Sequence, residues 1–200
     1  LLKFNERVLA MAEYDSTPLL ERLRYICIVS SNLDEFFEIR ISSLKEQLAL
    51  NAHRVGPDGY TPGEAFDRVQ LASRQLVEKQ YSLLTNQILP LLAKEGIGLT
   101  DPMSWSEEQR LWAHEIFMPL LTPIGLDPAH PFPRVFNKSL NFIVALSGED
   151  AFGRPGHIAI VQAPRALPRV IRMPPEVAGI PHGFILLSTL ISEFVGELFP

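Results

Sequence analysis

The distribution of proline is the feature of this sequence that most constrains how the chain folds. Four of the seventeen prolines lie among residues 1–100, whereas thirteen lie among residues 101–200. Proline has no amide hydrogen and its ring clashes with the preceding turn, so it interrupts helix interiors. The first half can therefore contain long helices, whereas the second half must consist of shorter elements.

The first half predicts helices throughout, because its apolar residues recur at steps of three or four. One helix is expected to begin at Ser31, with Asp34 three residues later as its capping-box partner. Thr61-Pro62-Gly63-Glu64 predicts the start of another, with a capping hydroxyl and a first-turn proline. An unbroken helix of roughly 30 residues follows from the spacing, and this length is typical of an antiparallel bundle.

The second half mixes helices and strands. Ser104-Trp105-Ser106-Glu107 predicts a capped helix, and Ser188 is expected to cap a last one over 187–198. Short strands bounded by Gly and Pro are predicted at 140–146, 158–161 and 170–173. The predicted fold class is multi-domain, α and α+β: an antiparallel helical bundle over residues 1–100, then an α+β domain with a small sheet over residues 101–200.

Composition excludes several classes of protein. The net charge is −5, and neither half has more basic than acidic residues, so a nucleic-acid-binding protein is not expected. Cys27 is the single cysteine, which excludes an internal disulfide, and its apolar neighbours predict a buried thiol. No apolar run approaches the roughly 20 residues that span a bilayer, so no transmembrane segment is predicted. The expected compartment is the cytoplasm, with peripheral association with a membrane left open.

Common catalytic signatures are missing from the sequence. It contains neither a phosphate-binding Gly-x-x-x-x-Gly-Lys-Ser/Thr loop nor a dinucleotide-binding Gly-x-Gly-x-x-Gly. The five histidines do not have the spacing of metal ligands. No catalytic residue and no metal-binding residue is therefore assigned.

Asn32 is the candidate binding residue, and it is expected in the first turn of the helix that begins at Ser31. A carboxamide offers two donors and an acceptor, which match the hydrogen-bonding edge of adenine. Asp34 and Glu35 would repel phosphate there, so a nucleotide would approach with its base. The alternative is purely structural: Ser31 caps the helix, and both carboxylates interact with its positive end.

Four blocks of the sequence, in order and in spacing, resemble the polyphosphate kinase family. They are Phe4-Asn5-Glu6-Arg7-Val8-Leu9, Pro18-Leu19-Leu20-Glu21-Arg22-Leu23, Ser31-Asn32-Leu33-Asp34-Glu35-Phe36-Phe37 and Asp127-Pro128-Ala129-His130-Pro131-Phe132-Pro133. The last block is followed by Ser139-Leu140-Asn141, as in that family. Ala10-Met11 departs from the family, which usually has a more acidic pair there. The resemblance extends over almost the whole chain.

The resemblance implies an enzyme that reversibly transfers the terminal phosphate of ATP to polyphosphate, leaving ADP. In that family a histidine is phosphorylated and Mg²⁺ neutralises charge. Both the histidine and the Mg²⁺ ligands are expected beyond residue 200, so this part alone is expected to be inactive. Asn32 is the one residue to which the resemblance assigns a contact with the nucleotide, because it matches the asparagine that contacts the adenine base in that family.

The resemblance also implies a domain organisation. Residues 1–100 would form the helical amino-terminal domain, and residues 101–200 would belong to the head, or middle, domain, through which the protein forms a homodimer. The chain starts without methionine and ends directly after an apolar segment. It is therefore expected to be a piece of a longer protein, with its head domain truncated at the carboxy-terminal end.

Other polar side chains have two open interpretations. Arg40 is expected to be partly buried beside a carboxylate such as Glu6 or Glu21, with phosphate contact as the alternative. His130 is a candidate anchor at the domain junction. A basic stretch is interpreted as solvated strand ends, with polyphosphate contact as the alternative. It consists of Arg165, Arg169 and Arg172.

A second hypothesis for the whole chain is a non-enzymatic helical module that binds a protein partner. Capped helices with one apolar stripe each fit this hypothesis as well as they fit the first. A module of this kind should expose a second apolar stripe, whereas a kinase should have a polar hollow around Asn32.

Overall fold

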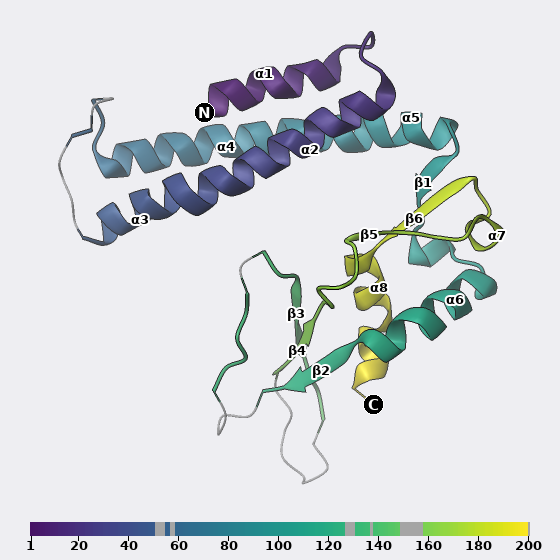
Figure 1. The fold of residues 1–200 in the computed structure, drawn as a ribbon. Helices are drawn as coiled ribbons and strands as arrows, with labels where there is room; N and C mark the ends of the chain where they lie inside the picture. Colours follow the sequence, from purple (N-terminus) through teal and green to yellow (C-terminus); the bar gives the residue numbers. More distant parts are fainter. Residues whose placement is uncertain (51–54, 57–58, 127–130, 137, 149–157, 200) are drawn as a thin grey trace. The chain divides into compact units, whose positions relative to one another are not determined.

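The computed structural model describes residues 1–50, 55–56, 59–126, 131–136, 138–148 and 158–199. It divides into two compact units, Leu1–Glu95 and Gly96–Pro200 (Figure 1). Each unit buries apolar residues of its own. Among the described residues, none of the helices combines the length and the apolar character that crossing a membrane requires.

The first unit begins with two antiparallel helices, α1 (Leu2–Glu13) and α2 (Leu19–Glu35), joined by a short turn (Figure 1). Proline ends that turn, and α2 starts directly after it because Pro18 is fixed at a φ of −53°. The buried face of α1 consists of three residues at steps of four and three: Asn5, Leu9 and Ala12.

The helix predicted to start at Ser31 does not start there. Ser31 is exposed inside α2, shortly before its last turn, and the helix continues through it to Glu35. The apolar period runs across Ser31, because Val29, Leu33 and Phe36 are all buried at steps of four and three. Packing of this stripe outweighs the weak local preference of serine for a cap.

Two π-helical turns extend the long helices of this unit. The first, Phe36–Ile41, connects α2 to α3 (Ser42–Ala49). The second, Leu84–Ile88, connects α4 (Pro62–Leu83) to α5 (Leu89–Lys94). The buried residues are five apart at both turns: Phe36 and Ile41 within the first, and Leu83, the last residue of α4, and Ile88 at the second. A π turn absorbs one additional residue, so both partners remain on the buried face of the helix.

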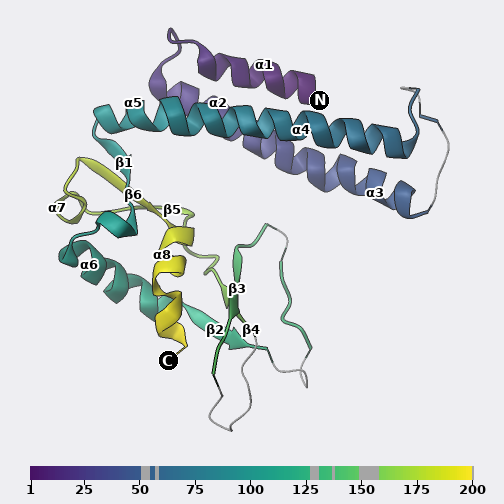
Figure 2. The same cartoon turned by 180° about the vertical axis from the view of Figure 1, so that it is seen from behind.

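The predicted start of α4 is confirmed. Thr61 Oγ1 accepts a hydrogen bond from the backbone N–H of Glu64, while the Glu64 carboxylate accepts one from the backbone N–H of Thr61. The rod formed by α4 and α5 runs antiparallel to the rod formed by α2 and α3 (Figure 2). Gln80 on α4 joins them, donating from Nε2 to the carbonyl oxygen of Ile26 at 2.9 Å and to Ser30 Oγ at 2.7 Å.

The described residues of the second unit form two three-stranded sheets. One has the order β1-β6-β5, with β1 parallel and β5 antiparallel to β6; the strands are Ile97–Leu99, His182–Leu186 and Val170–Arg172. The other is antiparallel in the order β2-β4-β3; its strands are Thr122–Gly125, Ile158–Gln162 and Asn141–Ala145. Gly98 pairs with Gly183 in the first sheet.

One core serves both sheets of this unit. Val161 of β4 and Ile185 of β6 are fully buried in the same apolar cluster as Leu190 and Phe194 of α8 (Leu187–Phe194). The cluster also includes residues of α6 (Glu107–Phe117) and of the four-residue helix α7 (Pro175–Ala178). Short 3₁₀ turns at Pro102–Ser104, Met118–Leu120 and Val195–Leu198 accompany these helices.

The predicted fold class, a helical bundle followed by an α+β region, is confirmed. The three predicted strands are present as β3, β4 and β5, whereas β1, β2 and β6 were missed.

Three local predictions in the two units are wrong. The cap of α6 is Ser106, paired with Gln109, instead of Ser104. Ser188 lies inside α8 and caps nothing. Cys27 is exposed, because it lies on the solvent side of α2 next to the buried Ile26.

Candidate functional site

Asn32 lies in the last turn of α2, half-buried, at the point where α2 passes into its π turn. It was predicted in the first turn of a helix, and it lies instead near the end of one. The positive end of the α2 dipole is therefore distant from Asn32. Its side chain faces α1, where Asn32 Nδ2 donates to Asn5 Oδ1 at 2.8 Å.

A hollow of about 240 Å³ lies beside Asn32, and we call it the Asn32 hollow. The start of α1, the end of α2 and the π turn form its wall. Its lining residues are Leu1, Phe4, Asn32, Glu35, Phe36, Ile39 and Arg40. The wall thus combines apolar and aromatic surface with one carboxamide, one carboxylate and one guanidinium, a composition typical of sites for small organic ligands.

The π turn brings Arg40 to this hollow. Phe36, Ile39 and Arg40 all come from the turn and line the same wall. Arg40 was expected to be partly buried beside Glu6 or Glu21, and this expectation is wrong: its side chain is exposed, and Glu21 pairs with Arg24 at 3.5 Å. The additional residue of the π turn directs Arg40 toward the hollow instead of the bundle interior.

Asn5 is a buried polar residue of this region that the sequence did not single out. It is fully buried on α1, and its Nδ2 has no hydrogen-bond partner among the described residues. The sequence contained a sign of its burial, because Asn5 lies at helical spacing from Leu9 and Ala12, on the same face of α1. Buried polar groups without a partner are rare enough to require an explanation.

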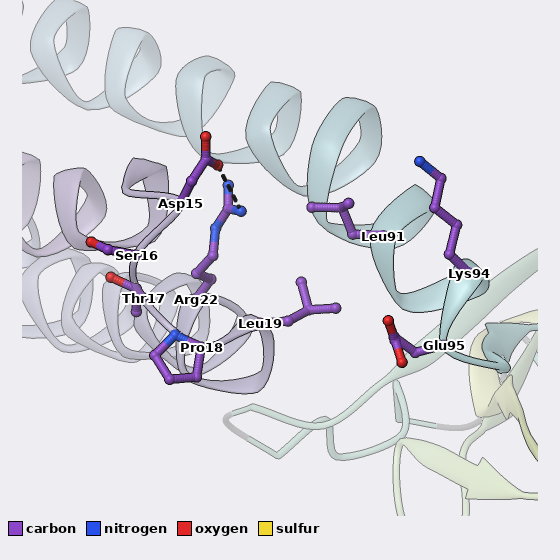
Figure 3. Close-up of a pocket in the computed structure, with 9 residues that line it drawn as sticks. All are labelled: Asp15, Ser16, Thr17, Pro18, Leu19, Arg22, Leu91, Lys94 and Glu95. Carbon is purple, nitrogen blue, oxygen red and sulfur yellow. Dashed lines mark hydrogen bonds and ion pairs between the residues drawn. The ribbon is translucent and has the colours of Figure 1, made fainter.

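A larger hollow in the same unit has a structural origin. It measures about 350 Å³ and lies beside the turn between α1 and α2, facing Leu91, Lys94 and Glu95 of the α5 region (Figure 3). Its buried cation, Arg22, donates to the Ala12 carbonyl at 2.8 Å, to Asp15 at 3.2 Å and to Gln87 at 3.4 Å. Its guanidinium is thus occupied by partners within the protein.

The predicted basic stretch is divided between two places in the second unit. Arg165 and Arg169 line a hollow of about 200 Å³ together with Lys138 and Ser139, whereas Arg172 ends β5 and does not line it. We call this the Arg165 hollow. Among the described residues that line it, none is acidic.

Several interactions hold the arginines of the Arg165 hollow in place. Arg169 Nη2 donates to the Lys138 carbonyl at 3.0 Å. Arg165 and Arg134 lie over the ring of Phe136, at 5.2 and 5.4 Å from its centroid. The cationic groups are therefore oriented before any ligand arrives.

His130 lies outside the described residues, as do His53 and His157. His114 is half-buried, and its Nε2 contacts a Glu197 carboxylate oxygen at 2.9 Å on the surface of the second unit. In the described part of the chain, no three residues among His, Cys, Asp and Glu form a cluster able to hold a metal ion.

Comparisons with known proteins agree on one family. The model of the polyphosphate kinase N-terminal domain matches residues 1–100, and the model of the polyphosphate kinase middle domain matches residues 108–200. A polyphosphate kinase of Paraburkholderia phytofirmans and one of Burkholderia ambifaria are each 56% identical to this chain over 204 residues. Each match covers 100% of this chain and 30% of the relative, so the chain spans less than a third of their length.

A solved structure gives the same result for the fold. The crystal structure of polyphosphate kinase from Porphyromonas gingivalis matches with a TM-score of 0.79 and 25% sequence identity. This match covers 100% of the present chain and 29% of that chain.

Proposed function

Because this chain belongs to the polyphosphate kinase family, we propose that it is part of an enzyme that reversibly transfers the terminal phosphate of ATP to polyphosphate. In this proposal residues 1–100 form the amino-terminal domain and contribute to binding adenine. Residues 101–200 belong to the head domain and contribute to dimerisation. The phosphorylated histidine lies beyond residue 200, and the enzyme acts in the cytoplasm.

The Asn32 hollow is the observation that carries the adenine assignment. Asn32 Nδ2 uses one hydrogen for Asn5, which leaves its second hydrogen and its Oδ1 for a ligand. An amide that offers one donor and one acceptor side by side matches the N6 and N7 edge of adenine. The apolar wall formed by Phe4, Phe36 and Ile39 supports the flat faces of a base.

Arg40 extends the same proposal toward the phosphates. Arg40 follows Asn32 by eight residues, which corresponds to about 12 Å along a helix. A nucleotide with its base at Asn32 can thus direct its charged end toward the Arg40 guanidinium. Glu35, which also lines the hollow, disfavours phosphate near the base end.

The second substrate, polyphosphate, is a linear polyanion, and the Arg165 hollow supports a contact with it. Guanidinium groups bind phosphate oxygens in a fixed geometry. Arg165 and Arg169 are held by Phe136 and by the Lys138 carbonyl, so they lose little side-chain freedom on binding.

Mg²⁺, which the family implies, does not fit a described cluster of side chains in this chain. The proposal therefore places its ligands in the remainder of the protein, beyond residue 200. The role of the described residues is to bind and orient the substrates.

The alternative, a helical interaction module, is not favoured. The α2 region exposes Ile28, Phe37 and Ile39, but steps of nine and two residues do not place them on one face of a helix, so they do not form the second apolar stripe that this hypothesis expects. The hollow beside Asn32 that the kinase hypothesis expects is present. Membership of the kinase family also favours the first hypothesis.

The test is the substitution Asn32→Ala in the full-length protein, with Asn86→Ala on an exposed helix position as the control. We expect the KM for ATP to rise about tenfold after Asn32→Ala, because a bidentate contact with the base is lost. Calorimetric titration with ATP should show the same loss of affinity. Unchanged KM and affinity would remove Asn32 from the site.

A further inference from the structure

Glu35 carries the one side-chain carboxylate among the described residues that line the Asn32 hollow. It is the last residue of α2, and it is exposed. In the part of the chain that the structure describes, its carboxylate has no hydrogen-bond or ion-pair partner, although Arg40 lines the same wall. Both oxygens of the Glu35 carboxylate are therefore available to accept hydrogen bonds from a ligand.

Three polar residues of this wall follow one another along the helix. Asn32 and Glu35 are three residues apart, so they lie on the same face with a rise of about 4.5 Å between them. Arg40 follows five residues later and lines the same hollow. Glu35 thus lies between the carboxamide and the guanidinium in the order of the chain, as the ribose of a nucleotide lies between its base and its phosphates.

We propose that Glu35 binds the ribose hydroxyl groups of the nucleotide, so that the hollow selects ribonucleotides over nucleotides that lack these hydroxyls. The inference rests on the proposed function, in which Asn32 contacts the base and Arg40 lies toward the phosphates. It goes further by assigning a binding residue to the sugar and by making the sugar a determinant of substrate choice.

The chemistry of a carboxylate favours the sugar over the other parts of ATP. An ionised carboxylate only accepts hydrogen bonds, and it repels phosphate oxygens, which are themselves negatively charged acceptors. The donors that ATP offers are its amino group and its ribose hydroxyls. The proposed function assigns the amino edge to Asn32, so the hydroxyls remain for Glu35. A carboxylate serves the ribose in the same way in dinucleotide-binding folds.

The charge of Glu35 also acts on the triphosphate, and this effect has to be separated from the hydrogen bonds. ATP and dideoxy-ATP, which lacks both ribose hydroxyls, have the same base and the same triphosphate. The repulsion between Glu35 and the phosphates therefore cancels in the ratio of their kcat/KM values. This ratio reports the contribution of the hydroxyls alone.

The experiment measures kcat/KM of the full-length protein for ATP and for dideoxy-ATP. We expect the wild type to prefer ATP by about tenfold or more, because hydrogen bonds to a charged acceptor are lost with the hydroxyls. Glu35→Ala should abolish this preference, since removing the hydroxyls has no further effect once their acceptor is absent. Glu35→Gln keeps one neutral acceptor and should show an intermediate ratio.

Asp34→Ala is the matched control for these variants. Asp34 is the neighbouring exposed carboxylate, but it does not line the Asn32 hollow, so its removal should leave the ratio at the wild-type value. Because Glu35 is exposed, its substitution should leave the fold intact, and circular dichroism checks this.

Three outcomes would overturn the inference. Equal kcat/KM for ATP and dideoxy-ATP in the wild type would mean that the enzyme does not use the hydroxyls. A preference that survives Glu35→Ala would mean that another residue binds them. The same loss of preference in Asp34→Ala would mean that a contact within the hollow is not the cause.

The proposed function and this inference fail in distinguishable ways, because Asn32→Ala reports on the base and Glu35→Ala reports on the ribose. If Asn32→Ala leaves the KM for ATP unchanged, the contact with the base is wrong, and the order of contacts on which the role of Glu35 rests is wrong as well. If Asn32→Ala raises that KM while Glu35→Ala leaves the ratio intact, only the role of Glu35 is wrong.

Discussion

Arg22 Nε donates to the carbonyl oxygen of Ala12 at 2.8 Å, so a buried cation on α2 closes the last turn of α1. Carbonyl groups at the end of a helix lack partners within the helix, and a cation there also interacts favourably with the helix dipole. The same guanidinium reaches Gln87 in the π turn before α5. One side chain thus connects three helical segments of the first unit.

Arg22→Met should destabilise this unit by about 2 kcal/mol, because hydrogen bonds from a charged, buried donor are lost while the apolar stem is kept. Urea denaturation of the chain measures this change. Asp15→Asn is the matched control: the Asp15 side chain is 97% exposed, and its pair with Arg22 should contribute less than about 1 kcal/mol. Equal losses in both variants would contradict the role assigned to the Ala12 contact.

The capping box of α4 predicts a dependence of stability on pH. The pKa of Glu64 lies below its ordinary value because the backbone N–H of Thr61, and next its hydroxyl, donate to the carboxylate. A lowered pKa means that the folded state favours the charged form. The stabilisation is therefore present above the pKa of the unfolded chain and is lost as the pH falls through the folded-state pKa.

Thermal denaturation of the wild type and of Glu64→Gln checks this dependence. Glu64→Gln should be less stable than the wild type at neutral pH, and the difference should vanish at a pH where the carboxylate is protonated in both states. Thr61→Ala should cost about 1 kcal/mol at neutral pH, as expected for loss of an N-cap. A difference that persists in acid would show that the charge of Glu64 is not the cause.

How far the sequence predicts this molecule depends on the range of the interactions. The start of α4 was predictable because Thr61 and Glu64 are three residues apart and make their bonds locally. Strands β1 and β6 were missed because Gly98 and Gly183 pair across more than eighty residues, and the β1 segment is too short to have a period of its own. The fold class follows from local patterns, but the sheet order does not.

The candidate site was predicted in part. A hollow lies beside Asn32, as the kinase hypothesis expects, although the predicted place of Asn32 in the helix was wrong; its contact with a nucleotide stays a prediction. Asn5 was missed because the period of a helix is followed through its apolar residues, whereas the structure buries Asn5 and leaves its apolar neighbour Phe4 48% exposed. Adjacent residues of a helix differ by about 100° in direction, so only one of the two can face the core, and the pattern of apolar residues does not show that it is Asn5.

The π turn over Phe36–Ile41 should tolerate loss of one residue better than a regular helix does. Deleting Glu38, an exposed residue of this turn, restores a spacing of four between Phe36 and Ile41, so both remain on the buried face. The deletion should therefore lower the free energy of unfolding by only about 1 kcal/mol. The affinity of the full-length protein for ATP should nevertheless fall, because Ile39 and Arg40 change direction around the hollow.

Deleting Arg24 from the regular part of α2 is the control for this change. Arg24 is also exposed, but its deletion turns every preceding buried residue of α2 by about 100° relative to those that follow. We therefore expect it to lower the free energy of unfolding by more than about 3 kcal/mol. Urea denaturation compares both deletions with the wild type. If the two deletions lower the free energy of unfolding equally, the π turn does not accommodate one additional residue in the way described.

The Arg165 hollow allows the two interpretations of the basic stretch to be separated. The double change Arg165→Gln/Arg169→Gln should raise the KM of the full-length protein for polyphosphate and leave the KM for ATP unchanged. Each lost arginine should also reduce the slope of log affinity against log salt concentration by about one, because fewer counterions are released. Arg172→Gln is the matched control, since Arg172 belongs to the same stretch but does not line the hollow. If all three arginines can be replaced without an effect on the KM for polyphosphate or on its salt dependence, they are solvated strand ends, and the contact with polyphosphate lies elsewhere.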